Sequence, residues 1–289
     1  MPLGARKTIA SLALALAPQA LASGEVSLSM EDLEIGRSES YVYVCETSQR
    51  QTAEKFGGND AFVHYTLGFD LTVSRVSEEY VDLELVFTRI GVDSHLGVFD
   101  SNEPEETDEN NLVAEALRPI IGEPFNVRLD AEREVLGVTA PSLAPVPDMM
   151  HSLYRRMFGD AYLSEALQPI FRIRAAPASA SPGDEWTRVL ERRVSVGRMD
   201  IVIEHRLQSV ENGTAIVPIT GEHRLRDQQT TPVSQRITEQ IVKGRAEWST
   251  SLDRLESLEL HKSFVVEAGD ENLLFRVTVI EHEEIRVGR

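Results

Sequence analysis

The residues most able to do chemistry in this chain are its acids, because 47 of its 289 residues are Asp or Glu. Two carboxylates placed on either side of a glycosidic bond can act as general acid and as base or nucleophile. A cell-envelope hydrolase that uses paired carboxylates is therefore one interpretation. With so many acids, some pair will lie at a suitable spacing by chance, so only a pocket that holds such a pair would favour this function.

Six of the acids lie in one short segment, residues 100–111, which contains no Lys or Arg. Carboxylate oxygens are the ligands that Ca²⁺ prefers, but the segment lacks the D-x-[DN]-x-[DN]-G spacing of a calcium loop. We expect a solvated acidic loop, and calcium-dependent adhesion through these residues is the alternative.

The other reactive side chains form no recognisable catalytic motif. The seven histidines are dispersed without an H-E-x-x-H or H-x-H pair, and neither G-x-S-x-G nor S-x-x-K occurs. A glycine-rich phosphate loop and a dinucleotide-binding fingerprint are absent as well. The sequence therefore predicts no catalytic residue, no metal and no cofactor, although a zinc site assembled from separate strands stays an alternative to surface histidines.

The single cysteine, Cys45, cannot form a disulfide within the chain. It lies in the strand-like run 41–45, where alternation places it on one face with Tyr41 and Tyr43. We expect a buried, inert thiol, and a nucleophile or a dimer-forming thiol is the alternative.

The N-terminus has the layout of a secretory signal peptide over residues 1–22: two basic residues, an apolar run and a small-residue cleavage site. Cleavage after Ala22 would remove Arg6 and Lys7 and no acid, which leaves 27 basic against 47 acidic residues and changes the net charge from −18 to −20. Ser23 stands where a lipoprotein has its cysteine, so lipidation is not expected. The sequence predicts an exported protein of the periplasm or the extracellular space, with no integral membrane segment after cleavage.

The acidic balance also bears on partners. A strongly negative chain repels the phosphates of nucleic acids and of anionic membranes, so we expect no nucleic-acid partner.

Alternating apolar residues dominate the first half of the chain. Residues 64–73 and 80–87 alternate and are joined by a polar segment, which predicts an antiparallel hairpin with one packed face. Helical spacing predicts a short helix over residues 112–121, which Gly122 ends.

The middle of the chain is helical in pattern. Apolar residues recur every three or four positions over residues 149–171, with breaks near Gly159 and Pro169, so we expect two helices or one broken helix. The segment 175–183 is rich in Pro and small residues and is the best linker in the chain.

Alternating strands return from Asp184 onward, with Asn212-Gly213 as a hairpin turn. The order of strand pairs repeats that of the first half and suggests an internal duplication. The expected fold class is α+β and mostly β, with two curved, half-barrel-like antiparallel sheets and a few helices packed on or between them. The expected division is a signal peptide (1–22), an N-terminal β-rich half with a short helix (23–143), a helical segment with linker (144–183) and a C-terminal β-rich half (184–289).

Several large apolar side chains are candidates for binding an apolar ligand. Methionine-rich helix faces adapt to varied apolar partners, and tryptophans at strand starts can stack on a ligand, although plain core packing explains both patterns as well. The candidate ligand-binding residues are Met150, Met157, Phe158, Trp186 and Trp248.

Short motifs along the mature chain resemble those of a family of uncharacterised secreted bacterial proteins. They lie at residues 99–101, Gly122, 127–138, 182–186 and 244–260. The resemblance implies duplicated, helix-covered β-sheets, and it brings no established activity. The chain is also distantly similar to the half-barrels of periplasmic lipoprotein carriers, which enclose apolar ligands. Two turn positions depart from the family pattern, because Arg133 and Glu256 stand where a glycine is expected.

Together these features predict a non-catalytic binding or scaffold module of the cell envelope. Its partner would be an apolar or lipid-like ligand held between sheet and helices, or another envelope protein. The identity of the ligand, the presence of a cavity and the oligomeric state are not determined by the sequence.

Overall fold

A computed structural model describes residues 25–53, 57–142, 146–174, 179–194, 197–226, 234–270 and 273–288. The expected signal peptide and residues 175–178 of the expected linker lie outside these described residues. Strands make up most of the chain, which confirms the α+β, mostly β fold class. None of the helices within the described ranges is long and apolar enough to cross a membrane.

The strands and helices follow one another with short connections. The strands of the first half are β1 (Val26–Ser27), β2 (Ser38–Ala53), β3 (Gly57–Val76), β4 (Tyr80–Ser94), β5 (Gly97–Asp100), β6 (Pro124–Asp130) and β7 (Val135–Thr139). The helices are η1 (Glu105–Asp108), α1 (Leu112–Leu117), η2 (Arg118–Ile120), η3 (Asp148–Met150), α2 (His151–Phe158) and α3 (Asp160–Phe171). The later strands are β8 (Ser179–Ala180), β9 (Glu185–Val194), β10 (Gly197–Arg206), β11 (Ser209–Glu211), β12 (Thr214–Leu225), β13 (Ser234–Ser249), β14 (Arg254–Asp270) and β15 (Leu273–Val287).

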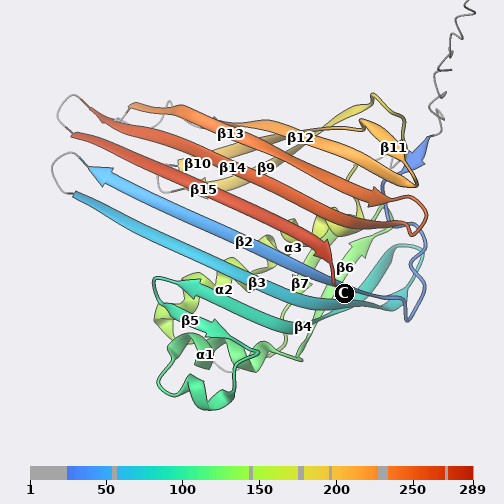
Figure 1. Cartoon of the computed structure of the whole chain (residues 1–289), viewed down its shortest axis with the longest axis horizontal. Coiled ribbons are helices and arrows are strands. Elements are labelled where there is room, and N and C mark those ends of the chain that lie inside the picture. Colours follow the sequence, from blue (N-terminus) through green and yellow to red (C-terminus); the bar gives the residue numbers. More distant parts are fainter. Residues whose placement is uncertain are drawn as a thin grey trace, which may run out of the picture.

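One large antiparallel sheet contains strands from both halves of the chain. Its order is β7-β6-β4-β3-β2-β15-β14-β13-β12-β10-β9, with β5 beside β4 and β11 beside β12, and β1 pairs separately with β8. The two sheets expected from the sequence are thus two ends of one sheet, because the last strand, β15, pairs with β2. This pairing runs from Phe275↔Ala53 to Val287↔Tyr41, and the strands lie side by side in the middle of Figure 1.

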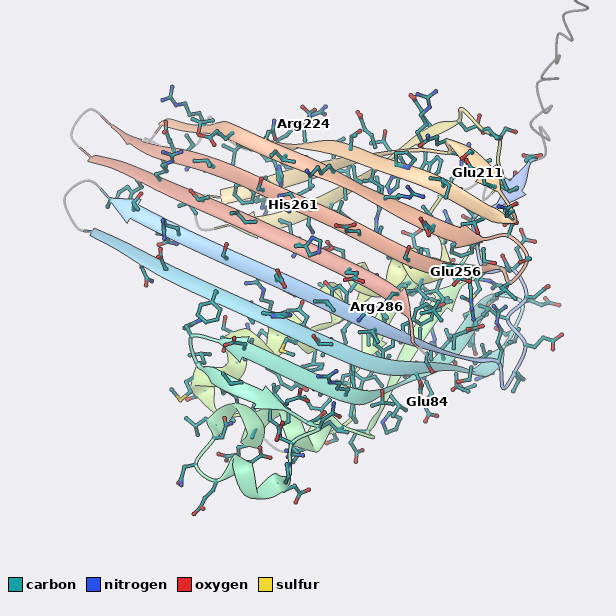
Figure 2. All side chains as sticks on the ribbon, in the orientation of Figure 1. Glu84, Glu211, Arg224, Glu256, His261 and Arg286 are labelled. Carbon is teal, nitrogen blue, oxygen red and sulfur yellow. The ribbon has the colours of Figure 1, made fainter. Side chains whose placement is uncertain are left out.

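The two faces of the sheet differ in polarity. Charged and polar side chains such as Glu84, Arg224 and His261 stand on the outer face, toward the viewer in Figure 2. The inner face is mostly apolar and packs on α2 and α3, and the α3 side chains Leu163 and Leu167 lie in the core between them. Burial of these apolar side chains is the main force that holds the helices to the sheet.

One of the two expected breaks in the helical region forms, and the other does not. Gly159 separates α2 from α3, and a Cβ there would overlap the Arg155 carbonyl oxygen. The break expected near Pro169 is wrong, because Pro169 lies inside α3, which continues to Phe171. The expected short helix forms as α1 and η2, and Gly122 after it has a φ of +80°, a conformation that favours glycine.

The hairpin turns explain the two missing turn glycines. Arg133 adopts a φ of +69°, and its guanidinium donates hydrogen bonds to the carbonyl oxygens of Met30 and Glu31, both 3.0 Å long. In the second hairpin the left-handed residue is Asp253, whereas Glu256 lies inside β14. The Asn212-Gly213 turn forms between β11 and β12 as expected.

Two strand glycines permit unusually close backbone approaches. A Cβ on Gly221 of β12 would overlap the Val202 carbonyl oxygen, and one on Gly244 of β13 would overlap the Glu259 carbonyl oxygen. A glycine in a strand commonly marks such an approach. These positions therefore require glycine for the observed strand packing.

We predict that Gly244→Ala lowers the free energy of unfolding by about 2 kcal/mol, because the new methyl group forces two paired strands apart. The control is Gly91→Ala in β4, where the nearest atom to the new Cβ lies 3.9 Å away. Chemical denaturation of both variants checks this. Equal stability of the two variants would contradict the requirement for glycine at residue 244.

Candidate functional site

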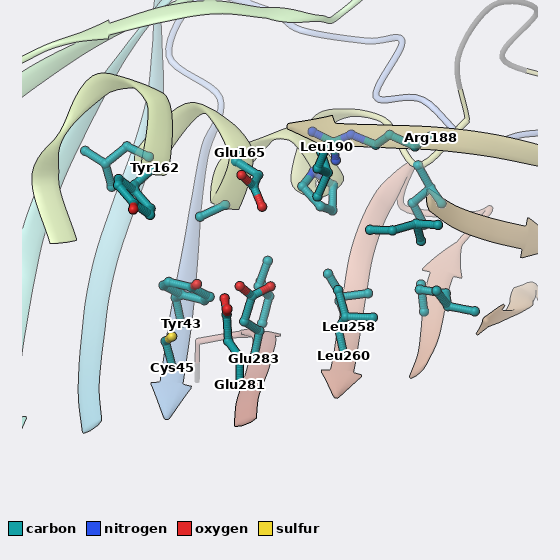
Figure 3. Close-up of a pocket in the computed structure, with 18 of the residues that line it drawn as sticks. Tyr43, Cys45, Tyr162, Glu165, Arg188, Leu190, Leu258, Leu260, Glu281 and Glu283 are labelled. Carbon is teal, nitrogen blue, oxygen red and sulfur yellow. The ribbon is translucent and has the colours of Figure 1, made fainter. Parts of the chain in front are cut away.

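A partly enclosed cavity lies between α3, the inner face of β9 and β10, and the inner face of β2, β14 and β15. The volume of this cavity is about 60 Å³. In Figure 3, Tyr162, Glu165 and Arg188 lie on one side of the cavity and Cys45, Glu281 and Glu283 on the other. The lining residues include Tyr43, Cys45, Tyr65, Arg156, Met157, Tyr162, Glu165, Arg172, Arg188, Leu190, Arg192, His205, Ala246, Leu258, Leu260, Glu281 and Glu283.

Strand alternation and register build the floor of the cavity. Glu281 and Glu283 are two residues apart on β15, so both side chains point to the inner face. Glu281 pairs with Lys262 of β14 on one side, and Glu283 pairs with Cys45 of β2 on the other. Residues from both ends of the chain therefore meet here through β-ladder pairing.

A network of buried ions occupies this floor. The Lys262 Nζ atom lies 3.0 Å from Glu281 Oε1 and 2.9 Å from Glu283 Oε1, and the lysine is only 2% exposed. Arg192 of β9 pairs with Glu165 of α3 at 2.7 Å and approaches Glu281 at 3.7 Å. The network therefore ties α3 and β9 to the centre of the sheet.

The charges in this network shift one another's pKa values. Burial disfavours the charged form of Lys262, but the carboxylates of Glu281 and Glu283 raise its pKa above the ordinary value. Burial likewise opposes ionisation of Glu281, yet the Lys262 ammonium holds its pKa well below the usual range. Burial and the neighbouring Glu281 carboxylate raise the pKa of Glu283. Two carboxylates that share a site each disfavour ionisation of the other, which opposes the effect of the lysine.

The thiol of Cys45 lies beside these carboxylates. Its Sγ atom and oxygens of Glu281 and Glu283 lie within 4.8 Å of one another, a grouping that could hold a metal ion. Burial raises the pKa of Cys45 to about 11, however, and the Lys262 ammonium already binds both carboxylates. A metal would have to displace a proton and a lysine, so the arrangement favours the lysine. Cys45 is 2% exposed and lies with buried Tyr41 and Tyr43, as expected.

The wall formed by β9 and β10 carries polar groups without protein partners. Arg188 is partly buried, and its side chain makes no hydrogen bond or ion pair to any residue in the described part of the chain. The Nε atom of Arg192 and the Nδ1 atom of His205 are buried and also lack a hydrogen-bond partner there. Burial, and to a lesser extent the charge of Arg188, lowers the pKa of His205 to about 4, so this ring is neutral at pH 7.

The structure places the predicted ligand-binding residues in different surroundings. Met157 lines the cavity, and Trp186 stacks on the cavity residue His205 with ring centroids 5.4 Å apart. Phe158 packs on Phe87 in the core, 5.1 Å between centroids. Met150 and Trp248 are almost fully buried, and neither is among the lining residues.

The acidic segment is partly neutralised by arginines. Asp100 pairs with Arg89 at 2.8 Å, and Asp108 pairs with Arg118. The side chain of Asn111 accepts hydrogen bonds from the backbone at the start of α1. These contacts fix the ends of a loop that was expected to be solvated.

The charged residues of the cavity are not among the candidates predicted from the sequence. Their burial is indicated by the face of the strand on which they lie. Lys262 shares its face with Leu258, Leu260 and Phe264, and Glu281 shares its face with buried Val277. A charge at an apolar position of an alternating strand marks a buried polar group.

We predict that Lys262→Met lowers the free energy of unfolding by about 3 kcal/mol or more, because it leaves the Glu281 carboxylate buried without its partner. The triple variant Lys262→Met, Glu281→Gln, Glu283→Gln should recover part of this loss. Arg50→Met is the control, since Arg50 pairs with Asp60 at the exposed surface. Chemical denaturation measures the stability of all three variants. A Lys262→Met variant as stable as the wild type would contradict the role of the lysine.

No protein-family model matches the chain, and no curated protein matches its sequence. Among solved structures, the chain is similar to lipovitellin, in a structure describing its lipid–protein interactions, with 10% identity and a TM-score of 0.41. That match covers 89% of this chain but only 26% of the lipovitellin chain. An outer membrane channel from Pseudomonas putida F1 matches with 9% identity and a TM-score of 0.21, covering 90% of this chain and 98% of the channel. The monoaromatic hydrocarbon channel CymD matches with 9% identity and a TM-score of 0.20, covering 89% of each chain. Likenesses this distant show no family.

Proposed function

We propose that this protein is an exported, non-catalytic binding protein that holds a small organic ligand in the cavity between α3 and the sheet. The observation that carries this proposal is the composition of the cavity wall. Apolar side chains such as Leu190, Leu258 and Leu260 line it together with ionic and unpartnered polar groups. Ligand sites commonly combine an apolar surface with a few polar groups that fix orientation.

The unpartnered groups are the strongest support. A buried polar atom without a hydrogen bond costs free energy, so most such atoms in proteins have a partner. Here His205 Nδ1 and Arg192 Nε have none among the described residues, and Arg188 beside them makes no ion pair. A ligand or ordered water in the cavity would satisfy all three.

The size of the cavity limits the ligand. One water needs about 10–15 Å³ of such volume, and a cavity of about 150 Å³ holds benzene. The cavity volume of about 60 Å³ therefore suits a few waters or one end of a small molecule that extends through the open side of this partly enclosed cavity, not a long acyl chain. We therefore propose a small ligand in place of the lipid-like ligand that the sequence predicts.

A hydrolase is the second candidate. Glu281 and Glu283 form a carboxylate pair with pKa values shifted in opposite directions, and both line the cavity. A protonated and an ionised carboxyl group are what acid–base hydrolysis needs. Both carboxylates are bound to Lys262, however, which gives them a structural role and makes binding the leading proposal.

Export is part of the proposal and depends on the N-terminal sequence. Residues 1–22 combine Arg6 and Lys7, an apolar run and a small-residue site ending at Ala22. Removal of this segment would leave a strongly acidic protein, and the cell envelope is the location that we propose.

We predict that at least one of butyrate, butyramide and butylamine raises the melting temperature of the mature protein, because a ligand that binds only the folded state stabilises it. Ala166→Leu, which fills the cavity from α3, should abolish this shift. Ala161→Leu, on the exposed side of the same helix, should keep it. Thermal unfolding of the three proteins checks the prediction.

The proposal fails if none of the three probes raises the melting temperature of the wild type. A shift that survives Ala166→Leu would place binding elsewhere on the protein. Mass spectrometry of the recovered butyramide tests hydrolysis of its amide bond, and released butyrate would contradict a non-catalytic role.

A further inference from the structure

The charges around the cavity are of opposite sign to those of the whole protein. The chain has a net charge of −18. Four arginines but only three glutamates line the cavity, and Lys262 lies directly beneath two of those glutamates. A local excess of positive charge inside an acidic protein attracts anions to this place in particular.

Most of these cations already have partners. Lys262 binds Glu281 and Glu283, Arg192 binds Glu165, and Arg172 lies 3.6 Å from Glu132. Arg188 makes no comparable contact within the described chain, although Glu165 and Glu283 are near enough to influence it electrostatically. Its guanidinium therefore has donors available for a ligand, as does that of Arg156 on α2, and of these two lining residues Arg188 is the one that lies on the β9–β10 wall with His205.

The β9–β10 ribbon places the Arg188 guanidinium on the same wall as other polar groups that lack a hydrogen-bond partner in the described chain. Trp186, Arg188, Leu190 and Arg192 alternate on the inner face of β9, and Arg188 is paired with Ile203 of β10. His205, two residues further along β10, is on the same face. A polar end of a ligand at Arg188 therefore has His205 and the Nε atom of Arg192 on the same wall, and the apolar Leu190 between the two arginines.

We propose that the ligand of this cavity is a small organic carboxylate, held by the Arg188 guanidinium with its short apolar part against Leu190, Leu258 and Leu260. This inference rests on the proposed binding function and names its ligand class. The planar guanidinium matches a carboxylate in a two-point hydrogen bond, which a lysine cannot reproduce. The three leucines account for an organic anion in preference to an inorganic one.

The experiment compares butyrate, butyramide, butylamine and inorganic phosphate by isothermal titration calorimetry with the full mature protein. Butyrate should bind at least tenfold more tightly than each of the other three. Arg188→Gln should weaken butyrate binding at least tenfold and leave the binding of butyramide unchanged. Arg188→Lys should give an intermediate affinity, because it keeps the charge and loses the planar fork.

The control is Arg206→Gln on the same ribbon, an exposed arginine 3.8 Å from Glu185, and it should bind butyrate like the wild type. Because the Arg188 guanidinium makes no hydrogen bond in the described structure, its replacement should leave the melting temperature nearly unchanged. That measurement shows whether the Arg188 variants are folded.

Each other result would overturn the inference in a distinguishable way. Equal binding of butyrate and butyramide, or no effect of Arg188→Gln, would refute the carboxylate site while the binding function stands. Tightest binding of butylamine would assign the cavity to cations through its glutamates, and tightest binding of phosphate would remove the role of the leucines. Absence of binding by all four probes would overturn both the inference and the proposed function.

Discussion

The pairing of β15 with β2 is the interaction on which the rest of the structure depends. It joins the last strand of the chain to the first long strand and so makes one sheet from two halves. The same register sets Cys45 beside Glu283, and the next strand, β14, sets Lys262 beside Glu281. Without this pairing the floor of the cavity would not exist, because its residues come from opposite ends of the sequence.

Burial of the ions beneath the cavity costs free energy of desolvation. Removing charges from water is expensive, and attraction between them offsets this cost only where geometry and hydrogen bonds are good. Here a single lysine contacts two carboxylates at about hydrogen-bond distance, and Arg192 connects the network to Glu165 on α3. Replacing such a network by apolar side chains of similar volume is often neutral or stabilising, so the ion pairs are weak evidence for stability alone.

The elements of the fold were predictable because they depend on local patterns. Alternation of apolar residues predicts the long strands, and helical spacing predicts the helices. Gly159 and Gly122 end helices in the structure, as predicted. The expected pair of sheets became one sheet because the contact between β2 and β15 joins segments that are distant in sequence. Alternation identifies the inner face of a strand but carries no information on which strand will be its neighbour.

The cavity was predictable only in part, for the same reason. Lys262 and Glu281 fall on faces shared with buried apolar residues, so their burial could have been read from alternation. Their contact could not, since it depends on register. Among the residues chosen from the sequence, Met157 lines the cavity, whereas Met150 and Trp248 are buried and are not lining residues. Large apolar side chains mark a core, and charges on apolar faces were the better indicators of a site.

Native-state hydrogen exchange tests most directly whether the two halves form one cooperative sheet around this site. The backbone amides of residues 41–53 and 275–287 should exchange together with the slowest amides of the protein, at a rate set by global unfolding. Faster exchange of one of these segments, with the other still protected, would show that the halves open independently. That result would contradict the central role of the β2–β15 pairing.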